Sequence, residues 1–188
     1  MRHFRFPLPL VAIVGSVFCL AYAAPRKLLS PPGKAQLSLA GARITVTYHR
    51  PKIRNPKTGA PRKIFGPGPG YLVPFDKVWR LGANQATTLI TTKDLRLAGH
   101  RLPAGTYTLF AIPAAHRWTL IVSRKTGEWG IPYPGQQYDF ARIPLAAHRT
   151  GRLVDPFTIS LSAAGARQAR LSFAWEHTVV VAPIRVSR

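Results

Sequence analysis

The stretch Arg170-Leu171-Ser172-Phe173-Ala174-Trp175-Glu176 decides the fold class of this chain. Its bulky apolar residues Leu171, Phe173 and Trp175 alternate with smaller or polar residues. Side chains alternate between the two faces of a β-strand, so this pattern would bury all three on one face of a sheet. A helix would scatter them around its circumference. The stretch therefore predicts a half-buried strand.

The same period of two recurs along most of the chain. Residues 43–48 and 157–162 alternate as cleanly as the first stretch. Further candidate strands lie at residues 36–39, 87–92, 94–98, 106–112, 118–123, 140–145 and 179–186. Turns containing Gly or Pro separate them, and no internal repeat is visible. A series of short, half-buried strands predicts one all-β domain, either an antiparallel β-sandwich or a jelly-roll-like barrel.

Two stretches do not have the pattern of a strand. Residues 52–70 and residues 130–137 are rich in Gly and Pro, which favours two long, restrained loops. Loops of this length in a compact domain are often functional, although mobility is the simpler explanation.

The N-terminus has the pattern of a secretory signal peptide. Arg2 and Arg5 precede an apolar stretch at residues 8–20, and Ala21-Tyr22-Ala23 fits a small-x-small cleavage site. The apolar stretch is shorter than the roughly 20 residues that a membrane span needs, which disfavours an uncleaved anchor. We expect residues 1–23 to be a signal peptide, with cleavage one residue later as the alternative. Residues 24–188 would then form the exported domain, in the periplasm or outside the cell.

The charge of the chain is strongly one-sided. It contains 27 Lys and Arg against 6 Asp and Glu, a formal net charge of +21, and the densest basic tract is residues 50–63. Such a field attracts anionic polymers and surfaces. Solubility in an acidic exterior is the simplest interpretation, and association with anionic envelope polymers is the second. Nucleic acid is disfavoured as a partner, because no recognisable binding motif accompanies the charge.

Several motifs in this chain resemble one known family. They are Trp79-Arg80-Leu81-Gly82-Ala83-Asn84, the stretch at residues 102–113, Arg62-Lys63-Ile64-Phe65-Gly66, and Tyr138-Asp139 followed by Arg142. Together they resemble the secreted bacterial domain of unknown function 2911 family over residues 36–184. The resemblance implies an exported domain but no particular reaction. This chain has Gln85 where the family usually has Glu, so a mechanism that needs a carboxylate there is in doubt.

Few residues could carry covalent chemistry. The chain lacks a Gly-x-Ser-x-Gly elbow, and its single cysteine, Cys19, lies in the predicted signal peptide. The five histidines after the signal show no metal-ligand spacing, although strands can bring distant histidines together. We therefore expect no metal and no cofactor. Glycoside hydrolysis needs a pair of carboxylates, and only six Asp and Glu are present in the chain.

A group of polar and aromatic residues forms the candidate site. Its members are Tyr48, Arg50, Trp79, Arg80, Asn84, Gln85, Tyr138 and Asp139. Aromatic faces beside guanidinium and amide groups can bind a sugar or a carboxylate. Each residue also has a structural interpretation: Trp79 could belong to the core, Asn84 could adopt a left-handed turn, and Arg80 could pair with Asp76 or Asp139.

Three classes of function stay open at this point. The leading expectation is an envelope protein that binds a small or glycan-like ligand, because carboxylates and nucleophiles are scarce. The alternative is an envelope hydrolase or isomerase that uses Asp139 or Glu176. The third is a basic structural module that associates with anionic envelope polymers. The sequence does not decide whether the protein is an enzyme.

Overall fold

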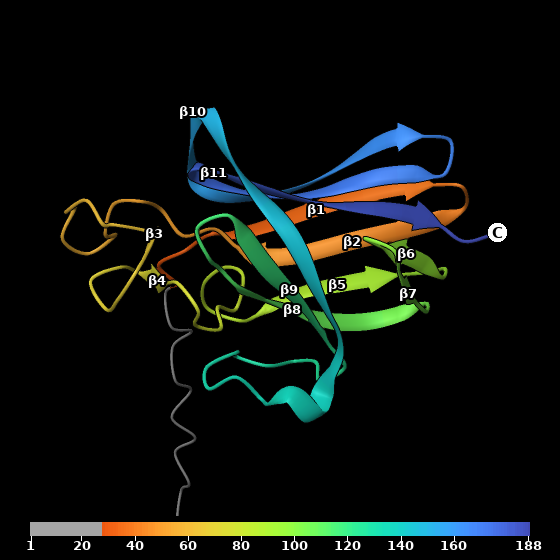
Figure 1. The fold of residues 1–188 in the computed structure, drawn as a ribbon, viewed down its shortest axis with the longest axis horizontal. Helices are drawn as coiled ribbons and strands as arrows, with labels where there is room; N and C mark the ends of the chain where they lie inside the picture. Colours follow the sequence, from red (N-terminus) through yellow and green to blue (C-terminus); the bar gives the residue numbers. More distant parts are fainter. Residues whose placement is uncertain (1–27) are drawn as a thin grey trace, which may run out of the picture.

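The longest strand, β10 (Asp139–Gly165), gives the molecule its shape. In the computed structural model, which describes residues 28–188, it crosses the molecule diagonally and then turns back along β11 (Gln168–Val186; Figure 1). Its first part pairs with β9, from Asp139 to Ala146, and its second part pairs with β11, from Ala147 to Gly165. The predicted signal peptide at residues 1–23 lies outside the described residues. No helix within residues 28–188 has the length and apolar character to span a bilayer.

The strands form one antiparallel sheet of nine, ordered β1-β2-β5-β8-β9-β10-β11-β6-β7. The remaining members are β1 (Pro32–Leu39), β2 (Ala42–His49), β5 (Thr87–Thr91), β6 (Leu95–Leu97), β7 (His100–Leu102), β8 (Gly105–Ile112) and β9 (Arg117–Ser123). Because β10 takes part in both halves, the sheet folds over into two layers. β1 and β7 form the outer edges of this order, so the sheet is open. The all-β antiparallel prediction is confirmed, and the sandwich is the form that the chain adopts.

The alternation seen in the sequence places the core between the two layers. In β2, Ile44, Val46 and Tyr48 are buried, whereas the residues between them are more exposed. In β11, Leu171, Phe173 and Trp175 are buried in the same way. The Tyr48 hydroxyl crosses from one layer to the other, where it accepts a hydrogen bond from Ile159 N (2.9 Å) and donates to Ile159 O (3.2 Å). This buried contact fastens β2 to the second part of β10.

Several predicted strands are shorter than those observed. The separate predictions at residues 140–145 and 157–162 are both parts of β10, and those at 170–176 and 179–186 are both parts of β11. The β10–β11 pairing changes register between Arg149 and Val154 and again before Thr158, where the strands bend without ending. A bulge of this kind keeps a strand continuous while its apolar pattern is interrupted, which is why the sequence suggested breaks.

The predicted loop at residues 52–70 contains a short strand. β3 (Phe65–Gly66) pairs in parallel with β4 (Val73–Pro74), and Arg54 and Pro61 form an isolated bridge. The second predicted loop, residues 130–137, is confirmed and runs into a short 3₁₀ turn, η1 (Gln136–Tyr138). β3 packs the partly buried Phe65 against the core.

Five aromatic rings, which we call the aromatic cluster, meet where the two layers face each other. They are Phe65, Trp79, Trp118, Phe157 and Trp175. Their ring centroids lie 5.0 to 6.0 Å apart, mostly edge to face, and Trp79 stacks on Trp175 at an interplanar angle of 20°. Edge-to-face contacts at these distances add to the stabilisation from burial. Trp118 and Trp175 are 3% and 1% exposed, as a structural role requires.

Removing the Tyr48 hydroxyl tests the connection between the layers. Tyr48→Phe leaves the backbone N–H and carbonyl of Ile159 without their buried partner. We expect the free energy of unfolding in urea to fall by about 1–3 kcal/mol. Tyr71→Phe is the matched control, because the Tyr71 hydroxyl makes no hydrogen bond within residues 28–188, and it should change stability by less than about 0.5 kcal/mol. Equal effects of the two variants would contradict this role for Tyr48.

Candidate functional site

A cavity of about 460 Å³ opens beside the segment that follows β4 and precedes β5. Its walls come from that segment, from the loop at residues 51–62, and from the aromatic cluster. The lining residues are Leu29, Ser30, Pro51, Asn55, Pro56, Lys57, Arg62, Leu72, Val73, Trp79, Arg80, Gly82, Ala83, Asn84, Ile131 and Trp175. This volume lies within the range of about 300–1,000 Å³ that is common for small-ligand sites. We refer to this hollow as the first cavity.

The wall formed by residues 79–84 is a tight turn that the sequence predicted in part. The indole N–H of Trp79 donates to Gly82 O at 2.9 Å, which closes the turn on itself. Leu81 and Asn84 both have a φ of 54°, so the left-handed conformation expected for Asn84 is confirmed. Gly82 lies so close to β2 that an added Cβ would stand 2.9 Å from His49 O. Only a residue without a side chain fits there.

Arg80 and Asn84 line the first cavity and also hold its wall in place. The Arg80 guanidinium donates to the backbone carbonyls of Asn84 and Trp129, the latter at 3.0 Å. It also stands 5.7 Å from the centroid of the Trp129 ring. The Asn84 amide donates to Ser30 O at 3.1 Å, which ties the turn to the start of the described chain. The alternative in which Arg80 pairs with Asp76 or Asp139 is not observed.

The charge of the first cavity is positive. Lys57, Arg62 and Arg80 line it, whereas all six carboxylate residues of the chain lie elsewhere. Burial lowers the pKa of Arg80 and of Arg62, and Asp155 partly offsets the effect at Arg62. Guanidinium groups nevertheless remain protonated at any physiological pH. A solute in this cavity therefore meets cationic groups and aromatic faces.

Five predicted site residues lie outside the first cavity: Tyr48, Arg50, Gln85, Tyr138 and Asp139. Arg50 donates to Phe157 O (3.4 Å) and to Thr158 Oγ1 (3.1 Å), so it joins the two layers next to Tyr48. Gln85 is exposed and does not line the cavity. Tyr138 belongs to η1 and is 37% exposed, with Lys125 Nζ 4.9 Å from its ring centroid.

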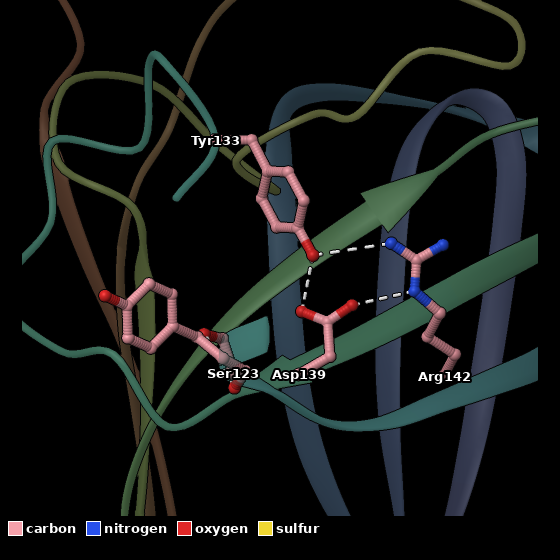
Figure 2. Close-up of polar contacts among 5 residues, drawn as sticks. Ser123, Tyr133, Asp139 and Arg142 are labelled. Atoms are coloured by element: carbon pink, nitrogen blue, oxygen red, sulfur yellow. Dashed lines mark hydrogen bonds and ion pairs between the residues drawn. The ribbon is translucent and has the colours of Figure 1, made fainter. Parts of the chain in front are cut away.

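Asp139 belongs to a separate polar network that fixes the loop at residues 130–137 (Figure 2). Its carboxylate accepts hydrogen bonds from the Tyr133 hydroxyl (2.5 Å) and from Arg142 Nε (2.7 Å), and Arg142 Nη2 also reaches the Tyr133 hydroxyl at 3.4 Å. Burial, followed by the hydrogen bond to Asp139, raises the pKa of Tyr133. The bond to Asp139 likewise raises the pKa of Arg142. With both oxygens engaged, this carboxylate is held as a structural anchor.

The basic tract at residues 50–63 is used largely to fold its own loop. Arg54 donates to Gly59 O at 3.0 Å, and Arg62 donates to the backbone carbonyls of Ile53 (3.2 Å) and Lys52. Lys57 differs from these two arginines, because its ammonium group makes no hydrogen bond or ion pair within residues 28–188 and it lines the first cavity.

Glu176 lies away from the first cavity, in a cleft that also contains His116, His148 and His177. Sequence reasoning found no relation among these histidines, because they come from three different elements. In the sequence, the only indication of this cleft was the break in alternation after Trp175. Within residues 28–188, no three His, Asp or Glu side chains are arranged to hold a metal ion.

Comparison with known proteins identifies the family. The chain belongs to the family described as protein of unknown function DUF2911, whose family model matches residues 30–184. This range agrees with the resemblance over residues 36–184 inferred from the motifs. No curated protein and no solved structure matched the chain.

Truncating Arg80 tests its structural contribution. Arg80→Ala removes the donor to the carbonyls of Asn84 and Trp129, so we expect the free energy of unfolding to fall by about 1–3 kcal/mol. Gln85→Ala is the control from the same segment, and it should lie within about 0.5 kcal/mol of the parent protein. Chemical denaturation measures both. A parent-like Arg80→Ala would mean that the guanidinium does not hold this wall.

Proposed function

We propose that this protein binds an anionic small molecule, or the acidic residue of a glycan, in the first cavity, and that it does so in the cell envelope after export. The observation that carries the proposal is the composition of the cavity wall. Lys57, Arg62 and Arg80 face a hollow whose other walls include Trp79 and Trp175, and no carboxylate lines it. Cationic groups beside a low-dielectric aromatic wall attract a carboxylate or phosphate more strongly than the same groups in bulk water.

The roles of the three cations differ. Arg62 and Arg80 are already oriented by hydrogen bonds to backbone carbonyls, so their charge is preorganised at the wall. A preorganised group loses little side-chain entropy when a ligand binds. The Lys57 ammonium group has no hydrogen-bond or ion-pair partner among residues 28–188 that it must leave. The Lys57 side chain is therefore suited to close on the ligand. The guanidiniums of Arg62 and Arg80 set the positive electrostatic potential of the cavity, and the indole rings of Trp79 and Trp175 supply apolar contact.

Lys57 allows binding to be tested without disturbing the fold. We expect Lys57→Ala to retain the parent melting temperature but to weaken binding of glucuronate, citrate and inorganic phosphate by about tenfold or more. Lys77→Ala, which removes an exposed lysine outside the cavity, is the matched control. Ligand-induced shifts in melting temperature and isothermal titration measure the effect. If no probe binds the parent protein, or if both variants bind equally well, the proposal fails.

A second candidate function, association with anionic envelope polymers, is favoured by a different observation. The strand register places Arg101 of β7 opposite Arg96 of β6, and Arg96 opposite Arg185 of β11. We call these three exposed residues the arginine ladder. Neighbouring strands lie about 4.8 Å apart, so three like charges stand side by side. Like charges directly opposite each other are destabilising, which an anionic polymer lying across the strands would relieve.

Further arginines near the arginine ladder add to the positive charge of this surface. Arg167, Arg170 and Arg188 line hollows that also contain Arg96. The one carboxylate there, Asp94, is 3.1 Å from Arg101, and hydrogen bonds from Ala104 and then Arg101 lower its pKa. In Figure 1, β6 and β7 lie at the opposite end of the molecule from β3 and β4. The two candidate functions therefore use separate surfaces.

Neutralising the ladder separates local docking from net charge. The triple variant Arg96→Ser, Arg101→Ser, Arg185→Ser should lose most of its retention on phosphatidylglycerol vesicles at low salt. The control Lys34→Ser, Lys77→Ser, Arg117→Ser removes the same charge from other exposed positions and should retain most of the binding. Cosedimentation at increasing salt measures both, because exposed charges are screened beyond about 10 Å at 0.1 M. Equal losses would show that net charge alone drives association.

A further inference from the structure

A second cleft, of about 660 Å³, lies where β10 and β11 bend. Three short runs of consecutive residues form its polar walls: residues 114–116 from the β8–β9 turn, residues 147–149 from β10, and residues 176–178 from β11. Phe65, Phe75 and Trp118 complete the lining. Phe65 and Trp118 belong to the aromatic cluster, whose other rings Trp79 and Trp175 line the first cavity.

β11 is distorted where it lines the cleft. Glu176 has a φ of 49°, in the left-handed region that a residue with a long side chain rarely adopts. The pairing there is irregular, since Thr178 faces Arg149 whereas Glu176 faces Val154. Glu176 and His177 both line the cleft at this irregularity. Bulges that redirect side chains are common beside functional sites, and backbone strain is concentrated there.

The ring of His177 is held in one orientation. Its Nδ1 lies 3.1 Å from the backbone carbonyl of Thr150, which can only accept a hydrogen bond. Nδ1 must therefore carry the proton in this contact. In the neutral ring, the lone pair then resides on Nε2, which is left to accept a hydrogen bond from another group.

The carboxylate of Glu176 has no partner of its own. Within residues 28–188 it takes part in no hydrogen bond and no ion pair. Burial raises its pKa, and the charges of His177 and Arg149 offset this only in part. A desolvated carboxylate without a donor is unfavourable for folding, which favours a role in contacting something outside the chain.

We propose that this cleft is a second ligand site, which binds a neutral, hydroxyl-rich molecule such as a sugar. The Glu176 carboxylate and His177 Nε2 both need donors, which adjacent hydroxyl groups supply. Arg149 supplies donors for the oxygens of the same ligand, and Phe65 and Phe75 offer apolar contact for the C–H face of a sugar ring. The opposed charges of Glu176 and Arg149 make a strongly charged ligand a poorer fit. This proposal does not depend on anion binding in the first cavity.

The binding test uses D-glucose, D-galactose, N-acetyl-D-glucosamine and mannitol at millimolar concentration, observed by saturation-transfer difference NMR. We expect transfer to at least one of them. Because hydrogen bonds to a charged group are lost, Glu176→Gln should weaken this binding by about tenfold or more. His177→Ala should weaken it as well. Lys57→Ala, in the first cavity, should leave it unchanged. Absence of transfer to all four probes, or binding that survives both cleft variants, would overturn the proposal.

Stability provides an independent readout for Glu176. A raised pKa means that the folded protein holds this proton more tightly than the unfolded chain, so stability is lost as pH rises from the unfolded pKa through the folded one. Glu176→Gln removes that loss, so the variant should have a higher melting temperature than the parent protein at pH 7. At a pH below both the folded and the unfolded pKa of Glu176, this difference should disappear. His116, His148, His177 and Arg149 line the same cleft as Glu176, and they are common to both proteins. Glu128→Gln, whose carboxylate pairs with Lys125, is the control and should not be stabilised. A lower melting temperature for Glu176→Gln at pH 7 would show a structural carboxylate and overturn the proposal.

Discussion

The contact on which this structure most depends is the aromatic cluster between the two layers of the sheet. Its rings come from β3, from the segment before β5, from β9, from the bend of β10 and from β11, so it joins segments that are far apart in the chain. The cluster also contributes to the walls of both hollows. Trp79 and Trp175 form part of the first cavity, whereas Phe65 and Trp118 form part of the second cleft. The centroids of Trp79 and Trp118 are 6.0 Å apart, so the two walls are in direct contact.

The scarcity of carboxylates shapes how the cations are used. Several guanidiniums donate to backbone carbonyls instead of pairing with acids: Arg62 to Ile53 and Lys52, Arg80 to Trp129 and Asn84, and Arg167 to Val186 and Ser187. A carbonyl orders a guanidinium without neutralising it, unlike a carboxylate. Loops are thereby fixed while their positive charge remains available. Within residues 28–188, this arrangement orders the loops without using up the positive charge of a protein whose formal net charge is +21.

The sequence predicted the strands because the period of two is a local property. Leu171, Phe173 and Trp175 alternate whatever the rest of the chain does. The motifs at residues 62–66, 79–84, 102–113 and 138–142 together indicated the family that the family model confirms. The grouping of side chains was predicted less well, because it depends on bends and turns. Arg80 and Asn84 do share a wall, but Gln85, one residue further on, points to solvent. The gathering of His116, His148 and His177 depends on a register change that no local pattern encodes.

The polar residues of this protein fall into two groups, according to whether they have hydrogen-bond or ion-pair partners within the described chain. Tyr48, Arg50, Arg80 and Asp139 each have partners within the chain, and their positions are explained by folding alone. Glu176 is not explained in this way. Its carboxylate is partly desolvated and accepts no hydrogen bond from residues 28–188, and its backbone is left-handed within a strand. Folding would be served better by a neutral residue with ordinary strand geometry. The unpaired carboxylate and the left-handed backbone at Glu176 both oppose folding, so this site is more informative about function than one whose polar groups already have partners. The motif at residues 79–84 is mainly of the latter kind, because the polar groups of Arg80 and Asn84 are hydrogen-bonded within the chain.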